Sequence, residues 1–339
     1  MLTAGDIFPS IKLLTEDGSA FDLAGDDIAG TYRILVLCGD LTSARAMAEL
    51  GKFKAAHDEI ATAAGYVFSI IPQAIEEAGP LLSDLALPFP TLSNPGGELS
   101  ETAAGAVTTI VIRPNHHVTA IFDDDVDDHA RAALDVIGED AENRKSRVIA
   151  RHPPVLIVPN VLSRKDCEHL IGIYNFQGNV MVEPGHGSKN MTTDYKMRID
   201  DYDREDRVDH WVINPETTNF VTNRLRARLF PEIEKAFHYK ITRHERYRIG
   251  SYSGERRGEA HGHRDNTEEI VAHRRFAASV NLNSEQFEGG ELRFPEYGGH
   301  LYRPETGAAI VFSSSMLHEA MHVTKGQRFV LLSFLFGDH

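Results

Sequence analysis

The pattern of apolar residues changes near residue 150, and this change constrains the fold more than any other feature. Before it, uninterrupted apolar runs such as residues 32–38 and 66–71 alternate with stretches rich in Ala, Glu and Lys. From Pro153 on, the apolar segments are short and glycine separates many of them. The first pattern is typical of an open α/β sheet, and the second of a sandwich or jelly roll. We therefore predict two domains, residues 1–140 and 153–339, with a charged linker over residues 141–152.

The first domain carries clear signals for alternating strands and helices. Buried strands are expected at the two apolar runs, and Gly65 and Pro72 are natural stops for the elements that precede them. The remaining predictions are helices over 42–64, 74–85 and 127–137, a proline-rich turn over 88–95, and a hairpin of 107–112 and 118–122.

The second domain opens with a strand and a capped helix and continues as short strands. Ser163 followed by Asp166 resembles a capping box, which predicts that a helix begins there. A second helical stretch is expected over 220–237. Strands are predicted over 155–158, over 245–249 with an end at Gly250, and over 275–283, 290–294, 308–312 and 328–336.

Charge and cysteine content limit the partners and the compartment. The net charge of -15, without a dense basic run, argues against a nucleic-acid partner. The two cysteines, Cys38 and Cys167, form no disulfide or zinc pattern, which favours a reducing cytoplasm. No signal sequence and no membrane-spanning segment is expected, and we predict a cytoplasmic chain without a membrane partner.

The His263-Arg264-Asp265 sequence has the spacing of two metal ligands on one strand, because alternate residues project to the same side. With 17 histidines and 50 acidic residues, chance gives roughly two or three His-x-acid matches, so the motif needs context. One other match, His57 with Glu59, falls on the predicted helix 42–64, where we interpret it as a solvated face.

Later residues supply that context. His318 follows the apolar strand 308–312 and can complete a two-histidine, one-carboxylate site of the kind that non-heme iron oxygenases use. Arg328 opens the next strand, where burial would require an anionic partner such as a carboxylate. Two alternatives stay open, with His261 replacing His263 or His322 replacing His318. A hydrogen-bonded surface role is the simple alternative for His318 itself.

Residues 153–339 resemble the prolyl 4-hydroxylase-like branch of the iron(II)- and 2-oxoglutarate-dependent dioxygenases. Several motifs carry the resemblance in order and spacing: Tyr252-Ser253-Gly254, His263-Arg264-Asp265-Asn266, Gly289-Gly290-Glu291-Leu292 with Pro295, His318 with Glu319, and Gly326-Gln327-Arg328. The resemblance implies a double-stranded β-helix, or jelly roll, with supporting helices. It also implies hydroxylation of a C–H bond, with succinate and CO2 as products.

The same resemblance implies a role for each site residue. His263, Asp265 and His318 would bind Fe(II). Arg328 would pair with the far carboxylate of 2-oxoglutarate, and Tyr252 would hydrogen-bond to that cosubstrate. In some relatives a tyrosine lies in the strand of Val280 to Asn283, so Asn281, which would point inward with Ser279, is a further candidate cosubstrate contact. O2 is the second cosubstrate, and ascorbate is a candidate cofactor.

The first domain resembles the peroxiredoxins, which have a thioredoxin-like α/β fold. The resemblance rests on Gly5-Asp6-Ile7-Phe8-Pro9 and on Asp17-Gly18-Ser19-Ala20-Phe21-Asp22-Leu23. Where that family has its reactive cysteine, this chain reads Thr42-Ser43-Ala44-Arg45. Cys38 lies in the preceding strand, as a packing residue would. We therefore interpret this domain as a peroxiredoxin-like scaffold that lacks the reactive cysteine.

Several questions stay open at the level of sequence. Trp211 is a packing residue or faces the substrate, Tyr247 is expected in the core, and residues 183–207 form a lid or a plain loop. The substrate is a prolyl or other peptidyl group or a small molecule, and a homodimer is a candidate assembly. The competing functions are a non-catalytic binding or sensing module and a thiol peroxidase that acts through Cys38.

Overall fold

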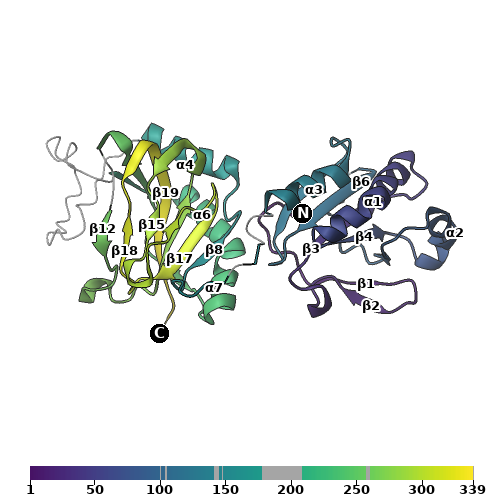
Figure 1. Ribbon diagram of the computed structural model, residues 1–339, viewed down its shortest axis with the longest axis horizontal. Coiled ribbons are helices and arrows are strands. Elements are labelled where there is room, and N and C mark those ends of the chain that lie inside the picture. The colour runs from purple at the N-terminus through teal and green to yellow at the C-terminus, as the bar shows by residue number, and fades with distance from the viewer. Residues whose placement is uncertain are drawn as a thin grey trace. The chain divides into compact units, whose positions relative to one another are not determined.

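The computed structural model describes residues 1–99, 101–103, 105–140, 145–146, 148–177, 208–256 and 260–338. The chain divides into two compact units, Met1–Arg147 and Val148–His339 (Figure 1). The division falls within residues 141–152, the segment predicted as a linker. Within the described residues, no helix is long and apolar enough to cross a membrane.

The N-terminal unit is a sheet with the strand order β2-β1-β5-β4-β3-β6-β7. Strands β3, β4 and β5 are parallel, whereas β6 runs antiparallel to both β3 and β7. A parallel βαβ unit followed by a β-hairpin and a helix is the topology of the thioredoxin fold, so the predicted fold class is confirmed. The elements are β1 (Lys12–Leu14), β2 (Ala20–Asp22), β3 (Tyr32–Cys38), α1 (Ala44–Thr62), β4 (Gly65–Ile71), α2 (Ile75–Leu85), β5 (Thr91–Ser93), β6 (Val107–Ile112), β7 (Val118–Phe122) and α3 (His129–Glu139).

Strand β3 shows why the strands of this unit could be predicted from the sequence. All of its residues are buried, and alternate side chains enter two separate cores. Ile34 and Val36 pack with the helices, whereas Leu35 and Leu37 pack with the N-terminal segment around Phe8. The proline-rich turn predicted over 88–95 is only partly correct, because it contains β5. A strand of three residues is too short to display a period of two.

The C-terminal unit contains two facing sheets and a layer of helices. The larger sheet has the order β8-β17-β13-β19-β11-β9, with β10 and β14 also paired to β19, and the smaller has the order β12-β18-β15-β16. The strands are β8 (Leu156–Val158), β9 (Val208–Trp211), β10 (Arg243–His244), β11 (Arg248–Ser253), β12 (Ala260–His263), β13 (Phe276–Asn281), β14 (Phe287–Gly289), β15 (Leu292–Arg293), β16 (Leu301–Tyr302), β17 (Ala309–Ser313), β18 (His318–Ala320) and β19 (Val323–Phe336). The helices are α4 (Arg164–Gln177), α6 (Pro215–Arg228) and α7 (Phe230–Phe237).

Two apolar cores cover the two faces of the larger sheet. One core joins the sheet to α4, α6 and α7, with Leu170, Leu225 and Ile233 among its helical members. The other joins it to the smaller sheet through residues such as Leu292 and Ala320. This arrangement agrees with the jelly roll with supporting helices that was predicted.

Three local predictions need correction in this unit. The strand expected over 245–249 spans Arg248–Ser253, because β11 lies between β19 and β9 and pairs with β19 along its whole length. The helical stretch 220–237 is two helices, with Pro231 in the first turn of α7. The last strand begins at Val323 instead of Arg328. The capping box is confirmed, since the Ser163 hydroxyl accepts from the Asp166 N–H and the Asp166 carboxylate accepts from the Ser163 N–H.

Candidate metal centre

The strands of the smaller sheet bring His263 and His318 together. His263 is the last residue of β12 and His318 is the first residue of β18, and the two are register partners. Their ring centroids lie 4.4 Å apart. Cross-strand pairing therefore explains how two histidines 55 positions apart in the numbering meet on one face of a sheet.

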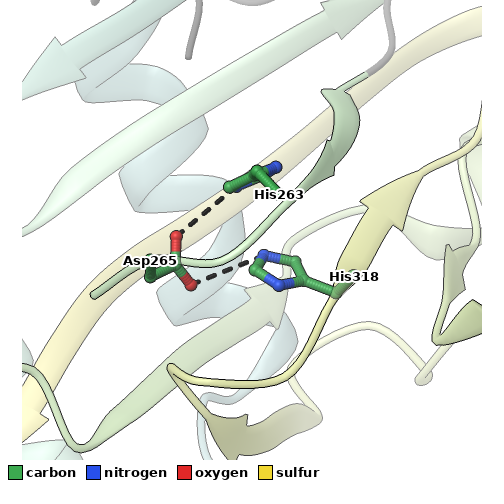
Figure 2. Close-up of side chains that lie close together, drawn as sticks. All are labelled: His263, Asp265 and His318. Atoms are coloured by element: carbon green, nitrogen blue, oxygen red, sulfur yellow. Dashed lines mark ion pairs between the residues drawn. The ribbon is translucent and has the colours of Figure 1, made fainter. Parts of the chain in front are cut away.

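The carboxylate of Asp265 faces both histidine rings (Figure 2). One of its carboxylate oxygens is 3.4 Å from Nε2 of His263 and the other is 3.4 Å from Nε2 of His318. One ligand atom from each of the three residues lies within 4.8 Å of those of the others. Two imidazoles and a carboxylate are the donor set of non-heme iron(II) oxygenases, so these residues fit such an ion chemically.

The environment of His318 prepares it to bind a metal ion. Its Nδ1 is 3.0 Å from the carbonyl oxygen of Met316, a contact that favours the tautomer with the proton on Nδ1 and the lone pair on Nε2. Burial lowers the pKa of His318 below its usual value, although the nearby Asp265 carboxylate opposes this effect. A neutral imidazole is the form that coordinates metals.

Asp265 itself is not on a strand, contrary to the prediction that alternate strand residues would align the pair. Strand β12 ends at His263, and Asp265 lies in the turn that follows. Its backbone is fixed instead by two hydrogen bonds: the N–H donates to the Ser314 carbonyl at 2.8 Å, and the carbonyl accepts from Arg274 at 3.1 Å. Glu245 in turn holds the Arg274 guanidinium at 2.6 and 2.8 Å. Sequence reasoning missed both Arg274 and Glu245.

The three residues border a cavity of about 530 Å³, counting the space open to solvent. Both sheets contribute to its wall, which combines apolar and polar side chains and holds two arginines. The lining residues are Arg248, Tyr252, His263, Asp265, Ala277, Ala278, Ser279, Leu292, Phe312, His318, Ala320, Arg328, Leu332, Ser333 and Phe334.

Arg328 and Tyr252 lie side by side in this wall. They are register partners on β19 and β11, and the guanidinium carbon of Arg328 is 5.0 Å from the centre of the Tyr252 ring. Both side chains are buried, at 3% and 4% exposed. A buried guanidinium beside a phenol suits a carboxylate, which can accept from both.

The Gly289-Gly290 pair gives Arg328 its space. Gly290 has φ of +69°, and a Cβ atom there would lie 3.0 Å from Cδ of Arg328. At Gly289, with φ of +76°, a Cβ atom would come within 2.2 Å of the His322 carbonyl oxygen. The motif is therefore required by backbone conformation and by the close passage of the Arg328 stem.

The structure separates the alternatives left open by the sequence. His322 is exposed and does not line the cavity, so His318 is the histidine brought to Asp265. Asn281 is buried beside Arg328, whose Nη2 lies 3.4 Å from its side-chain oxygen, and it does not line the cavity. Its predicted role as a cosubstrate contact stays a prediction. The side chain of His261 and residues 183–207, the candidate lid, lie outside the described residues.

Two aromatic residues also have defined places. Tyr247 is fully buried, as expected, with its hydroxyl 3.0 Å from that of Thr222. Trp211 is half-buried on the edge strand β9, with its ring 5.0 Å from the guanidinium carbon of Arg248. Arg248 is the second arginine of the cavity wall, and sequence reasoning gave it no role.

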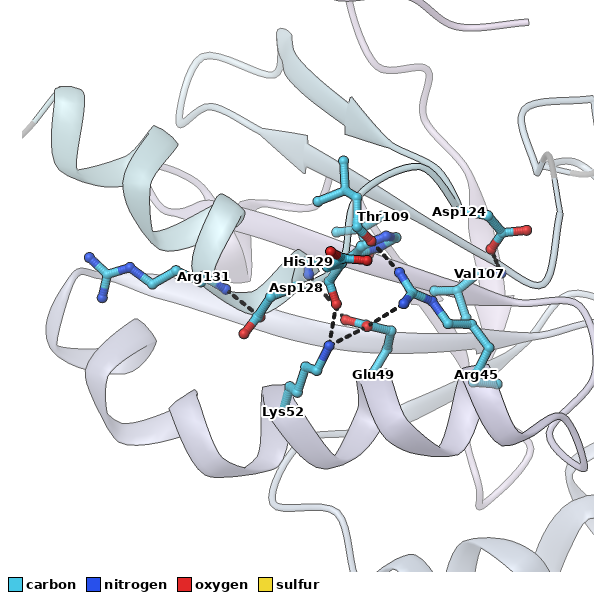
Figure 3. A network of polar contacts seen from close by, with 12 residues as sticks. Arg45, Glu49, Lys52, Val107, Thr109, Asp124, Asp128, His129 and Arg131 are labelled. Atoms are coloured by element: carbon cyan, nitrogen blue, oxygen red, sulfur yellow. Dashed lines mark hydrogen bonds and ion pairs between the residues drawn. The ribbon is translucent and has the colours of Figure 1, made fainter.

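A salt-bridge cluster surrounds Glu49 in the N-terminal unit. Glu49, fully buried on α1, is 3.4 Å from Arg45 and 2.8 Å from Lys52, and it accepts from the His129 N–H at 3.1 Å (Figure 3). Cys38 is buried, and burial raises the pKa of its thiol to about 12. A thiol that stays protonated and covered is a poor nucleophile, which opposes a peroxidase role.

Part of the C-terminal unit matches a known protein family. Residues 247–336 match the model of the 2OG-Fe(II) oxygenase superfamily, a range that contains Tyr252, Arg328 and the three metal-site residues. Among solved structures, peroxidoxin BcpB from Mycobacterium tuberculosis is similar at 16% identity and a TM-score of 0.38, over 43% of this chain and 100% of that one. AhpC from the same organism is similar at 19% identity and a TM-score of 0.36, over 43% and 97%. A putative thiol:disulfide interchange protein DsbE from Chlorobium tepidum is similar at 17% identity and a TM-score of 0.36, over 41% of this chain and 100% of that one. No curated protein matched the chain.

Proposed function

We propose that this chain is a hydroxylase that uses iron(II), 2-oxoglutarate and O2, and the match of residues 247–336 to the 2OG-Fe(II) oxygenase superfamily supports this proposal. The observation that carries the proposal is the meeting of two histidines and an aspartate beside a cavity whose wall contains a buried arginine. The oxygenase domain supports a dioxygenase-type function. We further propose that the reaction is hydroxylation of a C–H bond in a peptidyl or small-molecule substrate.

His263, Asp265 and His318 would hold the iron(II) ion. Arg328 would receive the far carboxylate of 2-oxoglutarate, and Tyr252 would donate to it. When bound, iron(II) and 2-oxoglutarate supply the chemistry that puts one oxygen atom of O2 into a substrate C–H bond and the other into succinate, with loss of CO2.

The residues of this chain position the reactants and exclude water. Leu292 and Ala320 from the smaller sheet and Phe312 from the larger sheet form an apolar wall around the polar groups. Exclusion of water from such a wall strengthens the pairing between Arg328 and a carboxylate. Phe312 also packs on His318, with ring centroids 4.6 Å apart, and so restrains the orientation of that imidazole.

Iron-dependent succinate formation tests the proposal. The full-length chain with iron(II) and 2-oxoglutarate should form succinate, and His263→Ala should reduce the rate of succinate formation to background. The same variant should lose manganese(II) binding, which electron paramagnetic resonance can measure. His322→Ala is the matched control, because it removes an exposed histidine outside the cavity, and it should change neither readout. Undiminished succinate formation by His263→Ala would refute the assignment.

Arg328→Ala tests the cosubstrate site separately. Loss of charge-assisted hydrogen bonds to a carboxylate should raise the KM for 2-oxoglutarate by about 100-fold, while manganese(II) binding persists. Equal KM values for the variant and the wild-type chain would show that the far carboxylate binds elsewhere.

A further inference from the structure

The cavity wall contains a second buried arginine, Arg248, which the proposed use of 2-oxoglutarate leaves without a role. Arg248 is the first residue of β11, four positions before Tyr252, and it is 3% exposed. In the sheet it lies opposite Leu332 on one side and Trp211 on the other. It therefore belongs to the same face as Tyr252 and Arg328, but to the other end of the cavity.

The distance between the two arginines along the sheet is too large for one carboxylate. Four residues of strand separate Arg248 from Tyr252, the register partner of Arg328, which corresponds to about 13 Å. The head groups do not lean together, since the guanidinium carbon of Arg248 lies 5.3 Å from the ring of Phe334, farther along β19. A carboxylate held at Arg328 therefore lies too far along the sheet to pair with Arg248 as well.

The surroundings of Arg248 favour a group with a single negative charge. The rings of Trp211 and Phe334 shield the cation from water, which strengthens any pairing with an anion. Asp209, fully buried on β9, lies 3.7 Å from Nη1 of Arg248 and makes the burial of the cation tolerable. The same carboxylate repels a phosphate dianion more than a carboxylate, whose planar oxygens also match the guanidinium fork.

Ser279 gives an independent indication of a ligand in the same row of the sheet. It lies opposite Leu332 on β13, so that Ser279 and Arg248 flank this leucine about 10 Å apart. Its side chain lines the cavity at 5% exposed, and its hydroxyl has no hydrogen-bond partner within the described residues. A buried hydroxyl in a cavity wall can donate to or accept from a molecule that enters there.

We propose that Arg248 and Ser279 form a substrate subsite in which Arg248 binds a carboxylate and Ser279 hydrogen-bonds to a second polar group of the same molecule. The substrate is then a small carboxylic acid that binds next to 2-oxoglutarate. This assignment rests on the proposed function, because it takes the Arg328 end of the cavity as the cosubstrate site.

Calorimetric titration tests the subsite without a known substrate. The full-length chain is first saturated with manganese(II) and 2-oxoglutarate under nitrogen, and then titrated with straight-chain monocarboxylates from acetate to hexanoate and with the corresponding primary amides. At least one carboxylate should bind, and its amide should bind roughly tenfold more weakly or worse, because the amide carries no charge for the guanidinium.

Variants then assign the binding to Arg248. Arg248→Met combined with Asp209→Asn removes both charges of the pair, so that no buried charge is left alone, and it should abolish carboxylate binding while 2-oxoglutarate binding is unchanged. Arg164→Met combined with Glu285→Gln removes an exposed ion pair outside the cavity and should change neither. Ser279→Ala should weaken longer carboxylates that carry a hydroxyl, such as 4-hydroxybutyrate, more than butyrate.

Each outcome decides between the two proposals. Absence of 2-oxoglutarate binding in the manganese-loaded wild type would remove the proposed function and the subsite with it. Three results would overturn the subsite alone, provided that 2-oxoglutarate binds normally. They are that no monocarboxylate binds, that amides bind as well as acids, or that carboxylate binding survives in the Arg248 double variant.

Discussion

Buried charges are arranged differently in the two units of this chain. In the N-terminal unit, Glu49 accepts contacts from Arg45, Lys52 and the His129 backbone, and these groups point toward one another (Figure 3). In the C-terminal unit, Arg248, Arg328 and the metal-site residues all line one cavity. The comparison teaches that buried charge indicates a functional site only where the groups converge on a space that a ligand can occupy. Where they satisfy one another, they stabilise the fold.

The largest effect expected from this contrast is a stability change without an activity change. Glu49→Gln should destabilise the N-terminal unit by about 2 kcal/mol, because it leaves Arg45 and Lys52 without their shared carboxylate. Hydrogen exchange of the amides in α1 and α3 measures this change. Succinate formation should stay at the wild-type rate.

Glu288→Gln provides the matched control for Glu49. It removes one carboxylate from an exposed ion pair with Lys325, and it should change the unfolding free energy by no more than about 0.5 kcal/mol. Loss of succinate formation in Glu49→Gln with the fold intact would contradict the division, since the N-terminal cluster would then contribute to the reaction.

A smaller effect should follow from Gly290→Ala, which tests how packing positions the cavity arginine. The added Cβ atom would strain a backbone with φ of +69° and press on Cδ of Arg328, at a cost of about 1 kcal/mol. The displaced guanidinium should raise the KM for 2-oxoglutarate several-fold, measured by succinate formation. Gly18→Ala has a comparable φ of +79° and no atom within 4 Å, so it should leave that KM unchanged. Equal KM shifts in both variants would indicate general strain instead of contact with Arg328.

These glycines show which parts of the site the sequence could predict. The order of His263, Gly290, His318 and Arg328 could predict the candidate metal site because each position has a strict requirement. These are two imidazole groups, a backbone with positive φ, and an arginine stem beside that backbone. Central strands such as β3 could also be predicted, since a strand that is buried on both faces has an uninterrupted apolar run.

Other parts could not be predicted because their signals are not local. Arg248 and Asp209 are charged residues on short strands, and only the pairing of β9, β11 and β19 reveals that both are buried. Arg274 supports Asp265 through a backbone carbonyl, which any residue could supply. Strand β12 ends before Asp265. The alternation argument therefore selected a residue that does lie beside His263 and His318, but for a reason that does not hold in the structure.

The smallest effect is expected at Cys38. Rapid labelling of this thiol in the native chain would contradict the interpretation that only the C-terminal unit has a functional site. Burial raises the pKa of this thiol from 9.0 to about 12, so the thiolate fraction at pH 8 is on the order of one in ten thousand. Because the folded pKa is raised, the protonated thiol adds stability that is fully present below about pH 9 and is lost as the pH rises toward 12.

At pH 8, iodoacetamide should therefore leave Cys38 unmodified in the native chain and label it only after denaturation, as peptide mass spectrometry can measure. Cys167 is an internal reference, since burial also raises its pKa to about 12. Peroxide consumption that is the same in Cys38→Ser and in the wild type would agree with a scaffold role, whereas rapid native labelling of Cys38 alone would give the N-terminal unit a reactive site of its own.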